Sequence, residues 1–256
     1  MRKVLIVALA ALITSPAAAA VTSKTLHGAL GGSLNSYLAA SDYLSGLIPT
    51  ELPGDNGWHP ANPAASNGSL DPAGLPAFTN DSGESGLAGL LNDFPGAGLP
   101  TKIVQYDLAN PTDIRAIRIL TGNDGLDGRV FATTLIEVST DNGSNFTDLA
   151  YVESDLPGTI NSGQWGSTLV TVTDDAGGYL ATGATNLIFN FYAVDNTGGE
   201  YRDPFDGVNP YTGVDDGLTA AIVAPLVWEI DVVPEPTALG LAGIALIGLA
   251  AARRRA

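Results

Sequence analysis

The stretches IVQYDL at Ile103–Leu108 and IRAIRIL at Ile114–Leu120 decide the fold of this chain. Both are short and rich in β-branched or aromatic residues, and turn-forming residues separate them, so each predicts a β-strand. In the second stretch the two arginines are out of phase with a strict two-residue alternation. This strand is therefore expected to carry a bulge or to face the core on both sides.

The same pattern continues toward the C-terminus, with turn residues between the runs and no helical segment. Asp141-Asn142-Gly143 stands between two runs and is a hairpin signal. Several antiparallel strands without helices predict an all-β fold, a single antiparallel β-sandwich with the jelly roll as the favoured form. The further runs are Thr133–Ser139, Phe146–Val152, Ser167–Thr173, Leu187–Val194 and Leu226–Val232.

The N-terminal part of the chain has a different character. Residues 51–100 are crowded with Pro, Gly, Asn and Ser and predict long ordered loops. Before them, apolar residues between Leu34 and Leu47 are spaced for one short amphipathic helix. We therefore expect residues 21–81 to form a loop-rich part of the domain and residues 82–233 to form the β-sandwich.

Both ends of the chain read as targeting segments. Arg2 and Lys3 precede the apolar run Val4–Ile13, and Ala18-Ala19-Ala20 supplies a small-residue cleavage site, which predicts a signal peptide over residues 1–20. At the other end, Pro234-Glu235-Pro236 is followed by the apolar run Thr237–Ala252. As a helix this run would extend roughly 24 Å, slightly less than a bilayer core of about 30 Å. The arginines after it would snorkel and remain on the cytoplasmic side.

This C-terminal arrangement resembles the PEP-CTERM sorting signal of Gram-negative bacteria. The residues that carry the resemblance are Pro234, Glu235, Pro236, Arg253, Arg254 and Arg255. It implies that residues 234–256 are read by a sorting protease, the exosortase, while the helix resides transiently in the inner membrane. It also implies a cell-surface or extracellular-matrix location after processing. An ordinary C-terminal anchor with a stop-transfer cluster is the alternative.

Charge and cysteine content limit the possible partners. Without both targeting segments the chain keeps 6 of its 11 basic residues and 26 of its 27 acids, which gives a formal charge of about −20. Such a chain repels phosphate groups, so nucleic acid is not an expected partner. Cysteine is absent, so the exported domain has no disulfide and depends on its core, on bound metal, or on both.

A second, weaker resemblance is to the discoidin type of galactose-binding-like domain, over roughly Ser82 to Val233. It implies an eight-stranded jelly roll that binds carbohydrate or another surface ligand through loops at one end. The chain departs from that family in the long Gly- and Asp-rich insertion Asp195–Ala220. The resemblance rests on Leu90–Asp93, Gln105–Leu108, Ile114–Leu120, Gly128–Phe131, Glu137–Gly143 and Trp228–Val232.

Several loops could hold structural calcium, which prefers carboxylate, amide and carbonyl oxygens. The discoidin resemblance implies a site formed by Asn92, Asp93 and Glu229. Asn or Asp in turn geometry is the competing explanation for every candidate. Two further sets come from the spacing of oxygen-bearing residues, namely Asn123, Asp124 and Asp127, and Asp203, Asp206, Asp215 and Asp216.

Aromatic residues in polar loops indicate a sugar site, because sugars stack their apolar faces on rings. The candidates are Trp165, Tyr201, Arg202 and Tyr211. The alternative for Tyr201–Asp206 is a loop that folds its own aromatic residues inward around an Arg–Asp pair. Evidence for catalysis is thin, since the chain has only two histidines and neither the zincin nor the hydrolase-elbow motif. We therefore expect a protein that is not an enzyme.

Three functions remain compatible with the sequence. The first is a non-catalytic carbohydrate-binding or adhesion module of the extracellular polysaccharide layer, with exopolysaccharide as its partner. The second is a passive structural matrix protein without a defined sugar site. The third, less favoured, is a glycan hydrolase that uses two carboxylates.

Overall fold

The computed structural model describes residues 20–29, 32–40, 42–63, 74–83, 86–122, 129–195 and 199–234. The regular secondary structure of these residues is almost entirely β-strand, with two short 3-10 helices, and long loops connect the elements. The elements are β1 (Val21–Gly28), η1 (Asn35–Tyr37), β2 (Thr50–Glu51), η2 (Leu75–Phe78), β3 (Lys102–Gly122), β4 (Thr133–Ser139), β5 (Thr147–Glu153), β6 (Ser167–Asp174), β7 (Ala181–Tyr192) and β8 (Leu226–Pro234).

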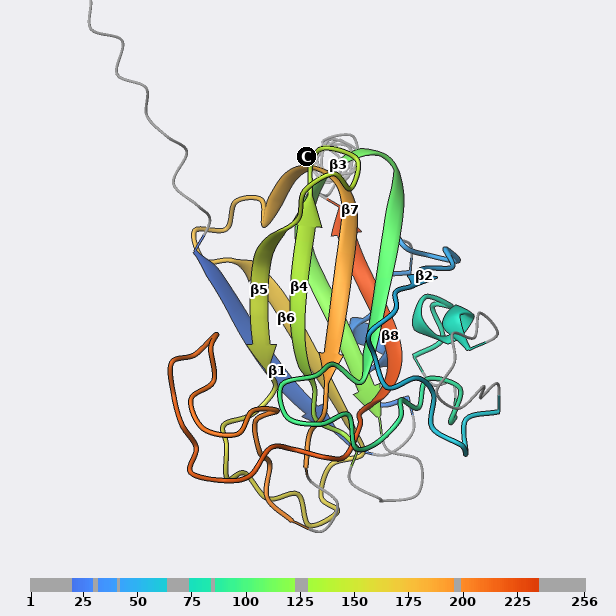
Figure 1. Ribbon diagram of the computed structural model, residues 1–256. Coiled ribbons are helices and arrows are strands. Elements are labelled where there is room, and N and C mark those ends of the chain that lie inside the picture. The colour runs from blue at the N-terminus through green and yellow to red at the C-terminus, as the bar shows by residue number, and fades with distance from the viewer. Residues whose placement is uncertain are drawn as a thin grey trace, which may run out of the picture.

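The strands form one antiparallel hydrogen-bonded sheet that folds into two layers (Figure 1). The first half of β3 pairs with β2 and β7, and β7 continues to β4 and β5. The second half of β3 lies between β8 and β6, and β6 continues to β1. The predicted antiparallel β-sandwich is confirmed.

Strand β3 joins the two layers. The two runs expected as separate strands are the halves of this 21-residue strand. Its pairing with β7 shifts between Asp107 and Thr112, where the chain crosses from one layer to the other. Its pairing with β8 shifts between Ile114 and Ala116, so Arg115 lies in the predicted bulge and the phase of the arginines is explained.

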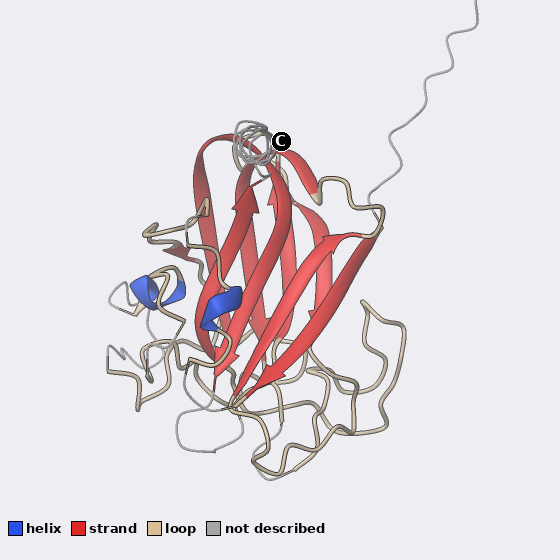
Figure 2. Ribbon diagram, turned by 180° about the vertical axis from the view of Figure 1, so that it is seen from behind, coloured by secondary structure: helices blue, strands red, loops and turns tan. Residues whose placement is uncertain are grey.

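Of the three apolar clusters among the described residues, the two larger ones stabilise the sandwich. The larger one fills the space between the layers and includes Tyr106, Ile119 and Phe189. The smaller one contains Leu34, Leu120 and Trp228, and covers the outer face of the β3–β8 pair. Because Leu34 belongs to the N-terminal segment, that segment acts as an additional layer over the outer face. Figure 2 shows both short helices outside the strands.

The N-terminal region contains more strand and less helix than the sequence predicts. Val21–Gly28 forms β1 at the edge of the sheet, paired along its whole length with β6. Four consecutive residues of β1 are exposed, so the sequence carries no alternation that would reveal the strand. The helix expected between Leu34 and Leu47 is only η1, three residues long, because Leu34 and Leu44 pack into different clusters.

Because the chain has no cysteine, no disulfide joins its distant segments, but a buried charge network does. The Nζ atom of Lys102 lies 3.0 Å from Glu51 Oε1 and 3.2 Å from Asp55 Oδ2, and its side chain is fully buried. It also lies 4.7 Å from the centre of the Trp58 ring, whose Nε1 donates to Glu51. Two carboxylates and an aromatic face thus compensate one desolvated ammonium group.

We predict that Gly89→Ala destabilises the domain. A Cβ at Gly89 would lie 1.6 Å from the backbone oxygen of Val227, so the loop would have to move away from β8. The expected cost is about 1–3 kcal/mol or more in the free energy of unfolding, measured by urea denaturation. Gly199→Ala is the control, because a Cβ there meets nothing within 4 Å. Equal stability of the two variants would contradict the packing described here.

Candidate functional site

The sandwich has two different ends. Val21 pairs with Asp174, and Ala116 pairs with both Thr173 and Val233, so the start of β1 and the end of β8 lie at the same end. We call it the terminal end, and Figure 1 shows it at the top. The connection 154–166 and the described residues of 193–225 lie at the opposite, loop end. The predicted signal peptide and sorting segment therefore adjoin one end, and the long loops occupy the other.

A polar groove of about 390 Å³ opens where β1 and β5 meet the loop end. Tyr151 and Glu153 project from β5 into its lining, and Asp155 follows directly after that strand. The Oγ1 atom of Thr25 donates to the Ser154 carbonyl at 2.5 Å and ties β1 to this turn. The remaining lining residues are Ser23, Leu156 and Thr212.

Two stacked tyrosines stand at this groove. The rings of Tyr151 and Tyr211 are 4.5 Å apart and nearly parallel, and Tyr211 keeps 39% of its surface exposed. Asn209 Nδ2 donates to the Tyr151 hydroxyl and to Glu153 Oε1, both at 3.1 Å. These two bonds hold the loop that contains Asn209 and Tyr211 against β5. Burial raises the pKa of Glu153, and burial followed by the nearby Glu153 charge raises the pKa of Tyr151. The site combines a ring, hydroxyl groups and carboxylates.

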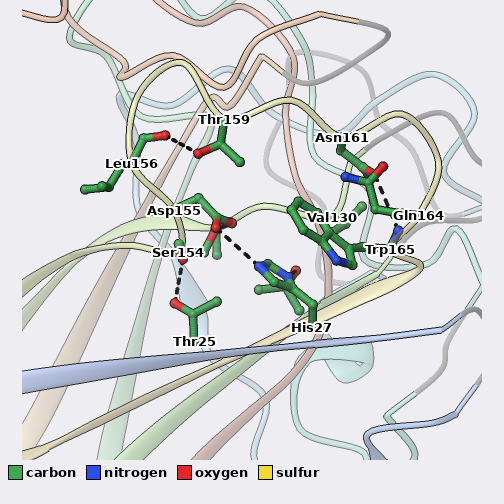
Figure 3. Close-up of polar contacts among 12 residues, drawn as sticks. Thr25, His27, Val130, Ser154, Asp155, Leu156, Thr159, Asn161, Gln164 and Trp165 are labelled. Atoms are coloured by element: carbon green, nitrogen blue, oxygen red, sulfur yellow. Dashed lines mark hydrogen bonds and ion pairs between the residues drawn. The ribbon is translucent and has the colours of Figure 1, made fainter.

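His27 and its contact residues flank the groove (Figure 3). His27 Nε2 lies 3.2 Å from Asp155 Oδ1, and Nδ1 lies 2.9 Å from Thr168 Oγ1. The imidazole stacks on Trp165 at 4.1 Å. Because Thr168 is fully buried, its hydroxyl cannot reach a substrate, so this arrangement connects β1, β6 and the Asp155 turn.

The four predicted ligand-binding residues do not come together. Tyr211 borders the groove through its stack on Tyr151. Trp165 instead stacks on His27 and is not among the residues that line the groove. Tyr201 is fully buried and shares a hydrogen bond with Thr133 Oγ1. Arg202 is engaged by Asp195 at 3.3 Å and donates to Thr219. For Tyr201 the structure agrees with the alternative interpretation, in which the loop folds its aromatic residue inward around an Arg–Asp pair.

The groove contains residues that the sequence analysis did not single out, above all Tyr151 and Glu153. The sequence holds a signal for them, because Tyr151 and Glu153 alternate with the apolar Ala150 and Val152. The burial pattern of β5 agrees and places both side chains on its more exposed face. Ser23 and Thr25 carry no such signal. They become part of the groove only because β1 lies beside the β5–β6 turn.

The predicted calcium site of Asn92, Asp93 and Glu229 is not assembled. Asp93 forms a two-point ion pair with Arg129 at 2.6 and 2.9 Å and accepts from the Ala224 amide at 2.8 Å. Glu229 lies five residues beyond Ala224 along extended chain, roughly 16 Å away. Asn92 donates to the Asn56 carbonyl. Asp93 therefore has a structural role in anchoring the start of β8.

The structure describes only one of the two other calcium candidates. Asn123, Asp124 and Asp127 lie outside the described residues. In the insertion loop, Asp203, Asp206, Asp215 and Asp216 each accept a hydrogen bond from a backbone amide, the role that Asp often has in turns. Over the described ranges, no three His, Cys, Asp or Glu side chains are grouped as a metal site.

The sorting residues lie almost wholly outside the described part of the chain. Pro234 ends β8 opposite Ile114 and lines a hollow of about 600 Å³ at the terminal end, together with Tyr43. Glu235, Pro236 and Arg253–Arg255 are beyond the described ranges. Within those ranges, none of the helices has the length and apolar character needed to cross a bilayer.

Comparison with known proteins identifies the C-terminus alone. Residues 232–255 match the model of the PEP-CTERM protein-sorting motif. No curated protein matches the chain. The motif overlaps the last residues of β8 and extends over the Pro-Glu-Pro sequence and the arginine cluster.

We predict that Asp93→Asn destabilises the protein irrespective of calcium. The substitution leaves Arg129, which is only 11% exposed, without its paired charge. The expected loss is about 3 kcal/mol in the free energy of unfolding, measured by urea denaturation with calcium and with chelator. A loss that appears only in the presence of calcium would show that Asp93 acts through a metal.

Proposed function

We propose a function that starts from the PEP-CTERM motif, which supports an exported protein sorted by an exosortase. We propose that the chain is a non-catalytic carbohydrate-binding module of the extracellular polysaccharide layer of a Gram-negative bacterium. The groove at the loop end is the proposed binding site. The observation that carries the proposal is the exposed Tyr211 ring, stacked on Tyr151 beside polar lining groups.

This combination fits the chemistry of sugars. A pyranose ring presents an apolar face that packs on an aromatic ring, and its hydroxyls need donors and acceptors at the side. The stack on Tyr151 holds the Tyr211 ring in place, which lowers the ordering cost of binding. Glu153, Asp155 and Thr212 supply acceptors and a hydroxyl. The chain is strongly acidic, so we expect a neutral or cation-bridged glycan rather than a free polyanion.

The two ends of the sandwich suit this role. The sorting segment follows Pro234 at the terminal end, whereas the groove lies at the loop end (Figure 1). A domain held by its sorting segment would therefore present the groove away from the membrane.

A passive structural role is the second candidate, and exposed apolar residues on the loops favour it. Leu156 is 80% exposed and Val208 is 63% exposed, and others lie on the same two connections. Such residues could mediate assembly of several copies without a sugar. The further members of this set are Ile160, Val214 and Ile222.

We predict that Tyr211→Ala weakens binding to the recognised polysaccharide about tenfold, because the stacking face is lost. Binding is measured by calorimetry with the full chain purified in detergent. Tyr43→Ala is the matched control, since Tyr43 is 37% exposed at the terminal end.

Three results would contradict the proposal. One is saturable binding that both variants retain in full. Another is the absence of saturable binding to any polysaccharide by the unsubstituted chain, which would favour the structural role. Release of oligosaccharide products would replace the non-catalytic proposal with a glycan hydrolase.

We predict that replacing Arg253, Arg254 and Arg255 with Gln leaves an unprocessed precursor in the envelope of a host that has the exosortase. The measurement is the intact mass of the protein in the membrane and extracellular fractions. Arg202→Gln is the control and should be processed normally. A mature, unsubstituted protein that still carries Arg253–Arg255 in such a host would contradict the sorting role.

A further inference from the structure

Lys102 is a completely buried lysine at the first position of β3. Its side chain has no exposed surface, and its Nζ atom faces the carboxylates of Glu51 and Asp55, whose side chains are only 3% and 5% exposed. An ammonium group and two carboxylates therefore meet where water has little access, and burying them has a large desolvation cost. This cluster lies outside the proposed glycan groove, so its role is a separate question.

The two carboxylates face the amine in different ways. Asp55 presents both of its oxygens to Nζ, Oδ2 at 3.2 Å and Oδ1 at 3.5 Å. The Cγ carbon that joins these oxygens therefore lies at a similar distance, near the roughly 3–3.5 Å of a near-attack geometry. Glu51 presents only Oε1, at 3.0 Å, and the same oxygen accepts from Trp58 Nε1 at 2.6 Å. Asp55 is thus placed as an electrophile, and Glu51 is placed as a proton acceptor.

The loop after β2 fixes Asp55 beside Lys102 through backbone contacts. The Leu52 and Asn56 amides donate to the carbonyls of the two residues that flank Lys102, at 3.0 and 3.2 Å. Between them the chain turns through Gly54, whose φ of +106° favours glycine. The amine and the carboxyl group are therefore oriented by the fold, and the entropy cost of bringing them together is already met.

Backbone donors also polarise the Asp55 carboxyl group. The Ile103 amide donates to Oδ2 and the Gly57 amide donates to Oδ1, both at 2.9 Å. Such donors stabilise the negative charge that develops on a carboxyl oxygen when a nucleophile attacks its carbon. The ring of Trp58, itself fully buried, lies 4.7 Å from Nζ and helps to exclude water. The site therefore combines a nucleophile, an activated carbon and a dry environment.

We propose that Lys102 and Asp55 form an intramolecular isopeptide bond, with Glu51 as the residue that relays the proton. Nζ gives a proton to Glu51 Oε1 and forms a bond to Cγ of Asp55. One Asp55 oxygen then leaves as water, taking that proton and a second one from the nitrogen. Of the three hydrogens on the ammonium group, one stays on the amide and two leave in the water, and Glu51 regains its starting charge.

The reaction needs no oxidant, reductant or other co-reactant. It replaces two buried opposite charges by a neutral amide, so the cost of desolvating both groups is removed. The bond joins positions 47 residues apart, and a cross-link of this span restricts the unfolded chain as a disulfide does. In a chain without cysteine it provides a covalent link that does not depend on an oxidising compartment.

The test is peptide mapping of the full chain, purified in detergent, denatured and digested with trypsin. Trypsin can cleave after Lys24, Lys102 and Arg115, so a free Lys102 gives the peptides 25–102 and 103–115. We expect instead one peptide, 25–115, lighter than its sequence mass by one water molecule. An acylated lysine has lost the charge that trypsin recognises, so cleavage after Lys102 is blocked. Fragmentation should place the link between Asp55 and Lys102.

Glu51→Gln tests the proton relay. This variant keeps the size of the side chain and an oxygen for the Trp58 hydrogen bond, but it lacks the basic carboxylate. It should remain folded, yield the two separate peptides, and unfold at least about 8 °C lower than the unsubstituted chain because the cross-link is absent. Glu200→Gln is the matched control on a different loop, and it should retain the link.

The mass of the unsubstituted chain decides the proposal by itself, so a variant that does not fold leaves the test intact. Peptides 25–102 and 103–115 at full mass from the folded chain would overturn the proposal and leave Lys102 as a buried ion pair. A link that attaches Lys102 to Glu51 would contradict the assignment of Asp55. A link that Glu51→Gln forms as completely as the unsubstituted chain would contradict the role of Glu51.

Discussion

The rest of the structure depends on one constraint, namely that strand β3 belongs to both layers. Its 21 residues pair with β7 in the first half and with β6 and β8 in the second. Loss of β3 would therefore separate both layers and open the central core. The crossing also sets the register of β8, which carries the buried acids Glu229 and Asp231 on one face and core residues such as Ile230 on the other.

In the absence of cysteine, contacts between distant segments hold the domain together. Most strands pair with strands far away in sequence, and buried ion pairs join further distant segments. Asp93 with Arg129 fixes the start of β8, and Lys102 with Glu51 fixes β2 against β3. Burying these charges costs free energy, which is recovered only when each charge meets its own partner. Each pair therefore specifies where its two segments pack. Glu229 and Asp231 are the exception, since two acids are buried together on one face of β8.

The sequence predicts the strands that have strong β composition, including Thr133–Ser139 with its bounds, and the hairpin at Asn142 and Gly143, both of which have positive φ. It could not reveal β1, because an exposed edge strand shows no alternation. The residues of the candidate site were harder to predict than the strands. Tyr211 was found as an aromatic residue in a polar loop, but its stacking partner Tyr151 and the β1 residues meet it only through tertiary packing. Glu229 was selected by resemblance, but its predicted partners Asn92 and Asp93 make other contacts, which depend on how the loops pack.

The central claim is that the loop end of an exosortase-sorted sandwich binds a glycan. The most direct test is equilibrium binding of the full chain to a panel of bacterial and plant polysaccharides, with calcium and again with chelator. The account predicts saturable binding to one class of polysaccharide. Absence of saturable binding by the folded chain, both with calcium and with chelator, would contradict the account.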